Sequence, residues 1–560
     1  MSVSDDLIAQ WHRDLARHRP LAEVLAAGLQ SVGKRALAPT NAADSALQHE
    51  LLWLLSELPR QAKLPEMARQ QALALLRVAL PRQQNELQPW AQVALRLLLT
   101  STEASTVLQV PQMLPSSVPL LFQDPLFLLL LQQSCLTDPQ LELALRDWRA
   151  LLLQAPECSV CWQPFAFALA HQLWNNGYLY ATFEAEAALL ARISQQLRVP
   201  PPSDAQFSDR VLRCALYSDL GSLRLSDLSL AVLLKTGPSW VRLLQKLIFD
   251  RRQEDRLARQ IPVVTPLPAA DLCQSFYAAY PYPRWLAAPV PPESSQAEML
   301  QGLFPHHNWA PHFSGQPRWL IAGCGTGRQV LAAAQACPQA RLTACDLSQP
   351  SLAYAARMLQ GFALTRDVAL VQADLLTLAQ QPGWSEAFDG VACGGVLHHL
   401  ADPFAGLQQL VAVLRPGGLL RLGVYSQTAR QTLRLPPPPA ARQDDAALCS
   451  WRWHWLQSHA DQAQEPLLQI QDFYQLGHCR DLLLHPREQP LTLPRLADWF
   501  AALQLQLLGL ELWDPRAYKL YSHHFPQDPT RCYLPYWHQL EQAYPHLFVQ
   551  MYIFWLRRSA

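Results

Sequence analysis

The spacing of apolar residues divides the chain near residue 260. Before that point apolar residues recur every three or four positions, as they do from Leu51 to Leu58, which predicts amphipathic helices. Asp124-Pro125 has the features of a helix start, because aspartate caps the first turn and proline fits within it. We therefore expect residues 1–260 to form an α-helical domain.

A helical hairpin is expected in the middle of this region. Phe165 to Trp174 and Tyr180 to Ile193 both show helical spacing, and Asn175-Asn176-Gly177 between them favours a turn. Successive hairpins would build a solenoid. No clean period of 34 residues is visible, so an irregular helical bundle is an equal alternative.

The pattern changes at residue 261. A proline-rich segment comes first, and we expect residues 261–317 to be a linker. Short β-like runs then alternate with helical runs over 318–426, which is typical of a doubly wound, Rossmann-like parallel sheet. The predicted strands are 319–322, 342–345, 368–372, 390–393 and 419–425.

Residues 427–560 are expected to complete the second domain. They contain an insertion rich in proline, glutamine and tryptophan, a strand predicted at 505–512 and an aromatic-rich stretch predicted to be a C-terminal helix. The fold class is therefore α plus α/β, with a solenoid-like helical domain preceding a Rossmann-like domain.

Composition adds constraints on location and partners. The chain has 560 residues, 16% of them charged, and a formal net charge of zero, so no basic footprint for nucleic acid is expected. The start of the chain lacks the apolar core of a signal peptide, and Asp124 and Pro125 interrupt the most apolar run, from Val118 to Leu131. The twelve cysteines are expected to be reduced thiols. These features predict a cytoplasmic protein without a membrane span.

A glycine-rich loop directly after the first predicted strand is the firmest chemical signal. Glycine permits a tight turn and lets the backbone approach a ligand closely, although such a loop alone is weak support for a site. The loop lacks the G-x-G-x-x-G spacing of dinucleotide oxidoreductases, which disfavours that class. Its residues are Gly323, Cys324, Gly325, Thr326 and Gly327.

Carboxylates stand at the ends of the next two predicted strands. Asp346, followed by Leu347, lies about 20 residues beyond the loop, where it can accept hydrogen bonds from ribose hydroxyls. Asp374, followed by Leu375, is placed to accept from an adenine amino group. The structural alternatives are a helix cap at Asp346 and a turn at Asp374.

A candidate cofactor-binding residue and candidate catalytic residues lie at the ends of the fourth and fifth strands. Cys393 ends the fourth strand, and His398 and His399 come soon after it. Either histidine could be a general base, but a structural or capping role is at least as favoured. Tyr425 ends the fifth strand on the same rim. Ligands of open α/β sheets bind outside the carboxyl ends of the strands, so these residues should meet.

Several polar residues outside the predicted sheet have both a functional and a structural interpretation. Tyr282 could close over a cofactor from the linker, or simply pack on the sheet. Asp481 and Arg487, in an apolar insertion, could recognise a substrate or form surface ion pairs. His478, Cys479 and His485 lack zinc spacing, so no metal is expected.

In this order, the elements over 318–426 resemble class I S-adenosylmethionine-dependent methyltransferases. The resemblance implies S-adenosylmethionine as cofactor, held by the loop, Asp346 and Asp374. The family usually carries an acid two positions before the first glycine, and this chain has Ile321 there. Either another group binds the amino-acid end of the cofactor, or that end of the site is weakened.

Flanking stretches are similar to bacterial proteins that fuse a tetratricopeptide-like helical region to a methyltransferase domain. These stretches are Tyr280 to Trp285, Asp472 to His485, and Phe548 to Trp555. The resemblance implies methyl transfer to an unidentified acceptor, which could be a protein recruited by the helical domain. The alternatives are a small-molecule acceptor and a non-catalytic interaction protein with a relict cofactor fold.

Overall fold

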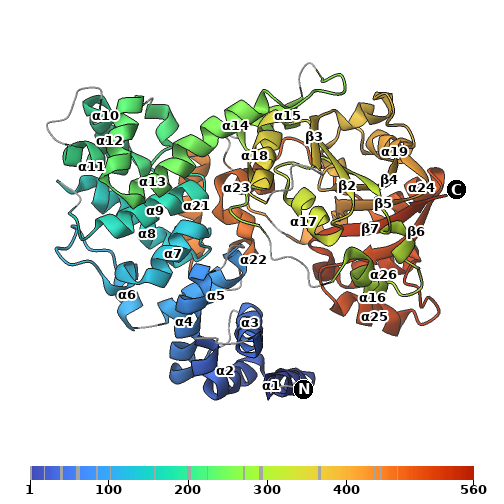
Figure 1. Cartoon of the computed structure of the whole chain (residues 1–560), viewed down its shortest axis with the longest axis horizontal. Coiled ribbons are helices and arrows are strands. Elements are labelled where there is room, and N and C mark those ends of the chain that lie inside the picture. The colour runs from blue at the N-terminus through green and yellow to red at the C-terminus, as the bar shows by residue number, and fades with distance from the viewer. Residues whose placement is uncertain are drawn as a thin grey trace. The chain divides into compact units, whose positions relative to one another are not determined.

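The chain folds into two compact units, each containing segments that are distant in the sequence (Figure 1). Unit 1 comprises Met1–Ile248, Leu286–Ala288 and Pro438–Leu476, and unit 2 comprises Phe249–Trp285, Pro289–Pro437 and Gly477–Ala560. The computed structural model describes residues 3–17, 19–37, 42–58, 63–82, 86–100, 102–156, 159–197, 204–223, 225–268, 271–288, 294–362, 368–433, 435–437, 439, 444–462 and 465–559.

Unit 1 is helical. The Asp124 side chain accepts from the first backbone N–H groups of α7, and Asp138 caps α8 in the same way, so the predicted helix start at Asp124-Pro125 is confirmed. The two helices of the predicted hairpin are present as α9 and α10, but α10 begins at Glu184 and packs mainly on α8 and α11. Whether these helices form solenoid-like repeats stays a prediction. The main helices are α1 (Val3–Ala16), α2 (Leu21–Leu37), α3 (Ala42–Ser56), α4 (Glu66–Ala79), α5 (Gln88–Leu99), α6 (Thr102–Leu108), α7 (Pro125–Gln133), α8 (Pro139–Gln154), α9 (Gln163–Asn175), α10 (Glu184–Gln196), α11 (Asp204–Ala215), α12 (Asp227–Thr236), α13 (Pro238–Leu244), α21 (Asp445–His459) and α22 (Pro466–Gln469).

A buried ion pair fixes the segment 438–476 within unit 1. Arg452 on α21 is 1% exposed and forms a bidentate pair with Glu142 on α8, 310 residues away. The second Arg452–Glu142 bond is 2.9 Å long, and Arg452 Nε donates to the Phe473 carbonyl at 2.7 Å. The expected segment 427–560 is therefore split between the units, because long-range contacts, which no local pattern encodes, place its middle in unit 1.

Replacing Arg452 by methionine should lower the free energy of unfolding of unit 1 by about 3–5 kcal/mol, because Glu142 would stay buried without its partner. Urea unfolding followed by tryptophan fluorescence measures the change. Adding Glu142→Gln to Arg452→Met should recover much of the loss, since the uncompensated charge is then gone. A single variant as stable as the wild type would contradict the role of the pair.

Unit 2 is built on one seven-stranded sheet with the order β3-β2-β1-β4-β5-β7-β6. Neighbours among β1 to β5 are parallel, whereas β7 runs antiparallel to both β5 and β6. All six predicted strands are confirmed. The strands are β1 (Arg318–Ala322), β2 (Arg341–Asp346), β3 (Val368–Gln372), β4 (Phe388–Gly394), β5 (Leu414–Tyr425), β6 (Leu505–Glu511) and β7 (Met551–Arg558).

The predicted C-terminal helix is wrong at its end, because residues 551–558 form β7. Tyr552, Phe554 and Trp555 are all buried, so both faces of this strand are covered. Such a strand shows a continuous apolar run rather than alternation, and periodicity alone cannot separate it from a buried helix. Its β-branched and aromatic residues favour the extended form.

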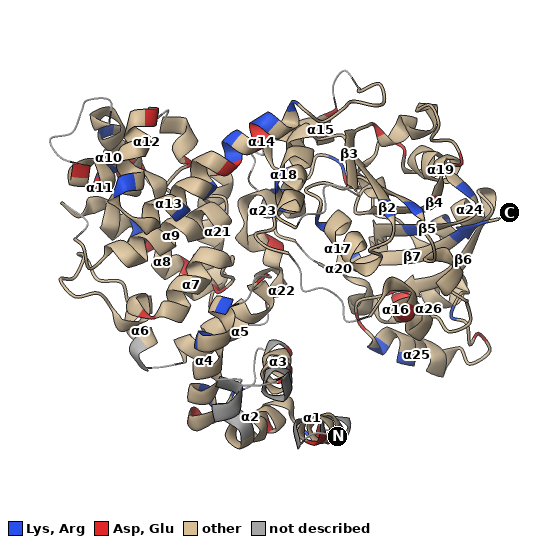
Figure 2. Ribbon diagram, in the orientation of Figure 1, with Lys and Arg blue, Asp and Glu red and all other residues tan. Residues whose placement is uncertain are grey.

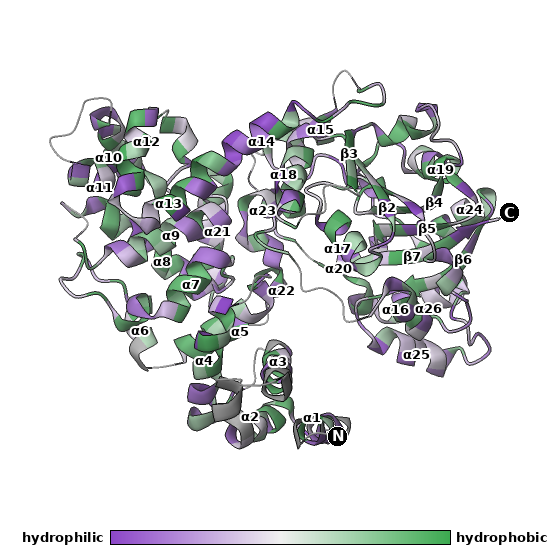
Figure 3. Ribbon diagram, viewed as in Figure 1, coloured by the Kyte–Doolittle hydropathy of each residue, from purple (hydrophilic) through white to green (hydrophobic). Residues whose placement is uncertain are grey.

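Helices cover the sheet, and its strands are largely apolar (Figure 3). One face buries Leu320, Val391 and Phe554 against Leu410 of α19 and Trp537 of α26. The helices of unit 2 are α14 (Asp250–Ala258), α15 (Leu272–Ala279), α16 (Gln296–Leu303), α17 (Arg328–Ala336), α18 (Gln349–Gln360), α19 (Pro403–Val413), α20 (Gln427–Thr432), α23 (Leu476–Leu484), α24 (Leu493–Ala502), α25 (Arg516–His524) and α26 (Leu534–Ala543).

The described residues before the sheet form helix α14, which precedes the predicted linker 261–317, and helices α15 and α16 within it. Helix α14 carries charges of both signs (Figure 2), and its Asp250 and Glu254 pair with Arg357 of α18 at 3.3 and 2.7 Å. The proline-rich stretch then lies along β3, where Val264 donates to the Gln372 carbonyl at 3.0 Å. These bonds cover the carboxyl end of the edge strand β3, where unpaired backbone groups could otherwise pair with another chain. In the described part of the chain, no helix combines the length and apolarity needed to cross a bilayer.

Candidate functional site

A cavity of about 350 Å³ lies at the carboxyl ends of the parallel strands of unit 2. This is where open α/β sheets bind their ligands. The cavity is lined by many of the residues proposed from the sequence, which are Gly323, Cys324, Gly325, Asp346, Leu347, Asp374, Leu375, Tyr282, His399, Tyr425, Asp481 and Arg487. The proposed residues outside its lining are Thr326, Gly327, Cys393 and His398.

The glycine loop is fixed from both sides by backbone contacts. Gly323 and Cys324 donate to the Cys345 carbonyl at 2.8 and 3.0 Å, so the loop is tied to the end of β2. Gly325 has φ +51°, and a Cβ there would lie 2.4 Å from the Tyr282 carbonyl oxygen. Position 325 therefore requires glycine because the Tyr282 carbonyl lies so close to it. This contact was not predicted from the sequence.

The segment 282–285 is seated on this loop. Thr326 is fully buried and its hydroxyl donates to the Pro283 carbonyl, while Trp285 Nε1 donates to the Thr326 carbonyl at 2.9 Å. Gly327 packs against α18, where a Cβ would lie 2.7 Å from that of Ala355. Thr326 thus holds the loop to the segment 282–285, and Gly327 lets the loop pack on α18. Tyr282 of this segment lines the cavity.

Asp346 is held by the backbone around it. Its Oδ2 accepts from Gly325 N at 2.8 Å and its Oδ1 from Ser348 N at 2.8 Å. Burial raises the pKa of this carboxyl above its ordinary value, and the backbone N–H groups only partly offset the effect. Each carboxylate oxygen has a second lone pair, so Asp346 can still accept from hydroxyl groups in the cavity.

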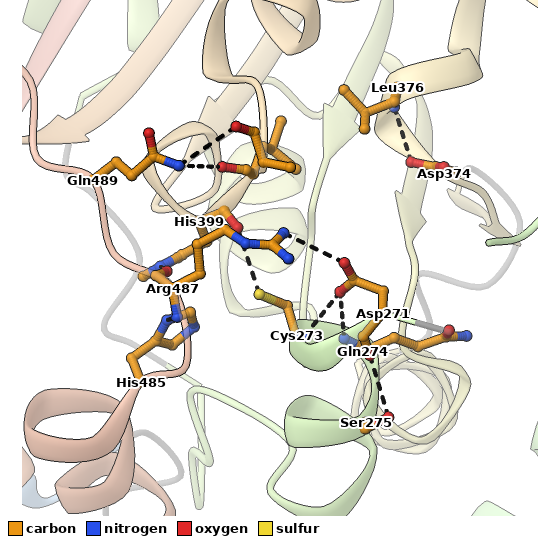
Figure 4. A network of polar contacts seen from close by, with 12 residues as sticks. Asp271, Cys273, Gln274, Ser275, Asp374, Leu376, His399, His485, Arg487 and Gln489 are labelled. Carbon is orange, nitrogen blue, oxygen red and sulfur yellow. Dashed lines mark hydrogen bonds and ion pairs between the residues drawn. The ribbon is translucent and has the colours of Figure 1, made fainter. Parts of the chain in front are cut away.

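Asp374 combines a structural role with a place in the cavity. Its Oδ1 accepts from Leu376 N at 2.9 Å (Figure 4), and its own N–H donates to Thr265 Oγ1 at 2.7 Å. The turn role expected as the alternative is therefore present. It leaves the carboxylate with unused lone pairs, which can accept from an amino group.

The two histidines after β4 have different surroundings. His398 is fully buried, and its Nδ1 accepts from Tyr425 N at 3.4 Å, so it supports the end of β5. His399 lines the cavity, and its Nδ1 lies 2.9 Å from the Arg487 carbonyl. A carbonyl only accepts, so Nδ1 carries the proton and Nε2 keeps a lone pair. Burial lowers the pKa of His399 to about 4, so the ring is neutral near pH 7.

A directional hydrogen-bond chain reaches the same cavity from α23. Arg487 N donates to His485 Nδ1 at 3.1 Å, so His485 carries its proton on Nε2 and donates to Tyr277 Oη, 3.1 Å away. The Tyr277 hydroxyl donates to Asp481 Oδ1 at 2.8 Å. Tyr277 was missed by sequence reasoning, and it lines the cavity together with Asp481. The sequence indicated this network only through Asp481 and Arg487, which are polar residues in an otherwise apolar insertion.

His399, Asp481 and His485 bring their ligand atoms within 4.8 Å of one another, which is a spacing compatible with a metal. The hydrogen bonds favour another arrangement, because His485 needs its Nε2 proton to donate to Tyr277. The rings of His399 and His485 also contact each other directly, with centroids 3.8 Å apart and their planes tilted by 31°. The absence of a metal here stays a prediction.

An ion pair ties α15 to the segment after α23 (Figure 4). Asp271 caps α15 through the N–H groups of Cys273 and Gln274, and its Oδ2 lies 3.4 Å from Arg487 Nη1. Gln489 Nε2 donates to the Leu400 carbonyl at 3.0 Å in the loop after β4. These contacts hold one wall of the cavity in place.

Unit 2 has a mostly parallel, Rossmann-like sheet of the kind found in class I methyltransferases, with a cavity at the carboxyl ends of its strands. Residues 320–420 match the family described as "Methyltransferase domain". An uncharacterized protein of Synechococcus is 38% identical over 161 residues, which cover 26% of this chain and 37% of that protein. A ubiquinone biosynthesis O-methyltransferase of Xanthomonas campestris is 36% identical over 111 residues, 20% of this chain and 44% of the enzyme. The chain thus spans less than half the length of these curated relatives.

Solved structures with a related fold include methyltransferases and one cyclase. PKMT2 from Rickettsia typhi in complex with AdoHcy aligns over 48% of this chain and 54% of its own, with 15% identity and a TM-score of 0.32. The [4+2]-cyclase SpnF aligns over 54% of this chain and 98% of its own, with 17% identity and a TM-score of 0.28.

Replacing Gly325 by alanine should destabilise unit 2 more than replacing Gly315. Both glycines have positive φ, which costs alanine about 1–2 kcal/mol. Only Gly325 meets the Tyr282 carbonyl, whereas a Cβ at Gly315 has nothing within 4 Å, so Gly325→Ala should cost about 1–3 kcal/mol more. Chemical denaturation of the two variants measures the difference. Equal losses would show that the contact with Tyr282 is unimportant.

Proposed function

We propose that this chain transfers a methyl group from S-adenosylmethionine to an acceptor. The observation that carries the proposal is the meeting of the glycine loop, Asp346 and Asp374 at one cavity, at the ends of three consecutive strands. Asp346 would accept from the ribose hydroxyls and Asp374 from the adenine amino group. The cofactor supplies an electrophilic methyl group on a sulfonium.

The residues of the chain would contribute mainly alignment and exclusion of water. The seated segment 282–285 and the ion pair between Asp271 and Arg487 form walls of the cavity. Walls held in place in this way would favour an in-line displacement, because they would align the reacting groups and limit the access of solvent.

Substituting Asp346 by asparagine should weaken S-adenosylhomocysteine binding about tenfold or more, because a charged acceptor is lost. Binding to the wild type should also weaken as the pH falls through the raised pKa of Asp346, since the protonated carboxyl accepts poorly. In Asp346→Asn that loss should disappear. Calorimetric titrations at several pH values measure both effects.

Asp514→Asn is the matched control, since Asp514 pairs with Arg516 outside the cavity lining. This variant should bind like the wild type. Absence of S-adenosylhomocysteine binding to the wild type at millimolar concentration would overturn the proposed function and favour the non-catalytic alternative. An unchanged affinity in Asp346→Asn would remove Asp346 from the site.

We further propose that the acceptor atom carries a proton and that His399 receives it. Asp481 and His399 Nε2 both present lone pairs, and the neutral ring of His399 can accept a proton at pH 7. His398 is outside the cavity lining and supports Tyr425 instead. As the acceptor gives up this proton, its electron pair forms the bond to the methyl carbon and the carbon–sulfur bond breaks.

His399→Gln should lower turnover by about 10²-fold or more at pH 7 while leaving the affinity for S-adenosylhomocysteine within about twofold. His398→Gln should lower thermal stability more than chemistry, because it loses a buried contact to the end of β5. Single-turnover kinetics and calorimetry separate these effects. Full turnover in His399→Gln would exclude it as the base.

The acceptor itself is proposed to be a protein, recruited by the helical unit, because helical arrays commonly present peptide-binding surfaces. Incubating the full chain with methyl-tritiated cofactor and a cell extract, then separating macromolecules from small molecules, tests this. Label in the protein fraction supports the proposal. Label confined to the small-molecule fraction would replace it with the alternative of a small-molecule acceptor.

A further inference from the structure

The proposed cofactor offers more hydrogen-bond donors than the two carboxylates accept. The ribose hydroxyls and the adenine amino group are assigned to Asp346 and Asp374, which leaves the ammonium of the methionine part. Ile321 stands where related proteins carry an acid, and it is buried at 1% exposure. An acceptor for the ammonium must therefore come from elsewhere in the chain.

Gln329 has such an acceptor and lines the cavity from the first turn of α17. Its Nε2 donates to the Gly394 carbonyl at 3.3 Å, which fixes the orientation of the amide because the opposite one would place two oxygens together. Its Oε1 is buried and has no hydrogen-bond partner in the described part of the chain. A buried acceptor without a partner is costly, so a donor in the cavity would be stabilised there.

The position of Gln329 matches the missing acid. Ile321 on β1 pairs with Ala392 on β4, and Gly394 lies two residues further, so these three positions share one face of the sheet. A Cβ at Gly394 would lie 2.9 Å from Gln329 Nε2, which shows that Gln329 occupies this face. The amide therefore reaches the face that an acidic side chain at position 321 would occupy.

We propose that Gln329 Oε1 accepts a hydrogen bond from the cofactor's ammonium and takes the place of the missing acid. This inference rests on the proposed function and explains how the site works with isoleucine at position 321. Gly394 and Gln329 form one unit, since the glycine leaves the space and its carbonyl orients the amide.

The test compares two ligands that differ in the amino-acid part. S-adenosylhomocysteine has the ammonium, whereas 5′-methylthioadenosine has the same nucleoside but no amino-acid group. Gln329→Ala should weaken S-adenosylhomocysteine binding by roughly 10- to 100-fold and change methylthioadenosine binding by less than about twofold. Calorimetry of the full chain with each ligand gives both affinities.

Gln335→Ala is the matched control on the same helix. Gln335 also has a buried Oε1 without a hydrogen-bond partner among the described residues, but it is not part of the cavity lining. Its variant should bind both ligands like the wild type. Gln329→Met, which keeps the side-chain volume, should show the same selective loss as Gln329→Ala and guards against a folding defect.

The outcomes separate this inference from the function on which it rests. If both Gln329 variants bind S-adenosylhomocysteine as the wild type does, or lose both ligands equally, Gln329 does not bind the ammonium and the methyltransferase proposal is untouched. If the wild type binds neither ligand, the proposed function itself is overturned together with the inference.

Discussion

The close approach of the Tyr282 carbonyl to Gly325 is the constraint on which the site depends. It is possible only because position 325 has no side chain, and it brings the segment 282–285 onto the loop. The hydroxyl of Thr326 and the indole of Trp285 then hold the loop and the segment 282–285 together. The same loop orients Asp346 through Gly325 N, so Gly325 connects the segment 282–285 with the cavity wall formed by Asp346.

Much of the sheet could be predicted because its signals are local. Each parallel strand is a short apolar run, and the loop and Asp346 directly follow the strands that position them. Because the carboxyl ends of parallel strands meet at one edge of a sheet, the residues that follow these strands could also be predicted to gather there. This reasoning predicts nine of the residues that line the cavity, whereas Tyr282, Asp481 and Arg487 were proposed from segments that flank the sheet.

Long-range contacts explain what the sequence could not show. Strand β7 is buried on both faces, so its pattern does not reveal an extended conformation. The chain of bonds through Tyr277 joins two segments 204 residues apart. Gln329 on α17 likewise gives no signal by itself, because the amide is oriented by Gly394 on β4, 65 residues away.

The Arg452–Glu142 pair also bears on the inheritance of the two units. Unit 1 is completed by residues encoded after most of the sheet, so a gene fragment ending near residue 260 would encode Glu142 without Arg452. Recombination that exchanged only the first part of the gene would separate the two charges. The coding sequences of the two units are therefore interleaved and are inherited together, even though each unit has its own core.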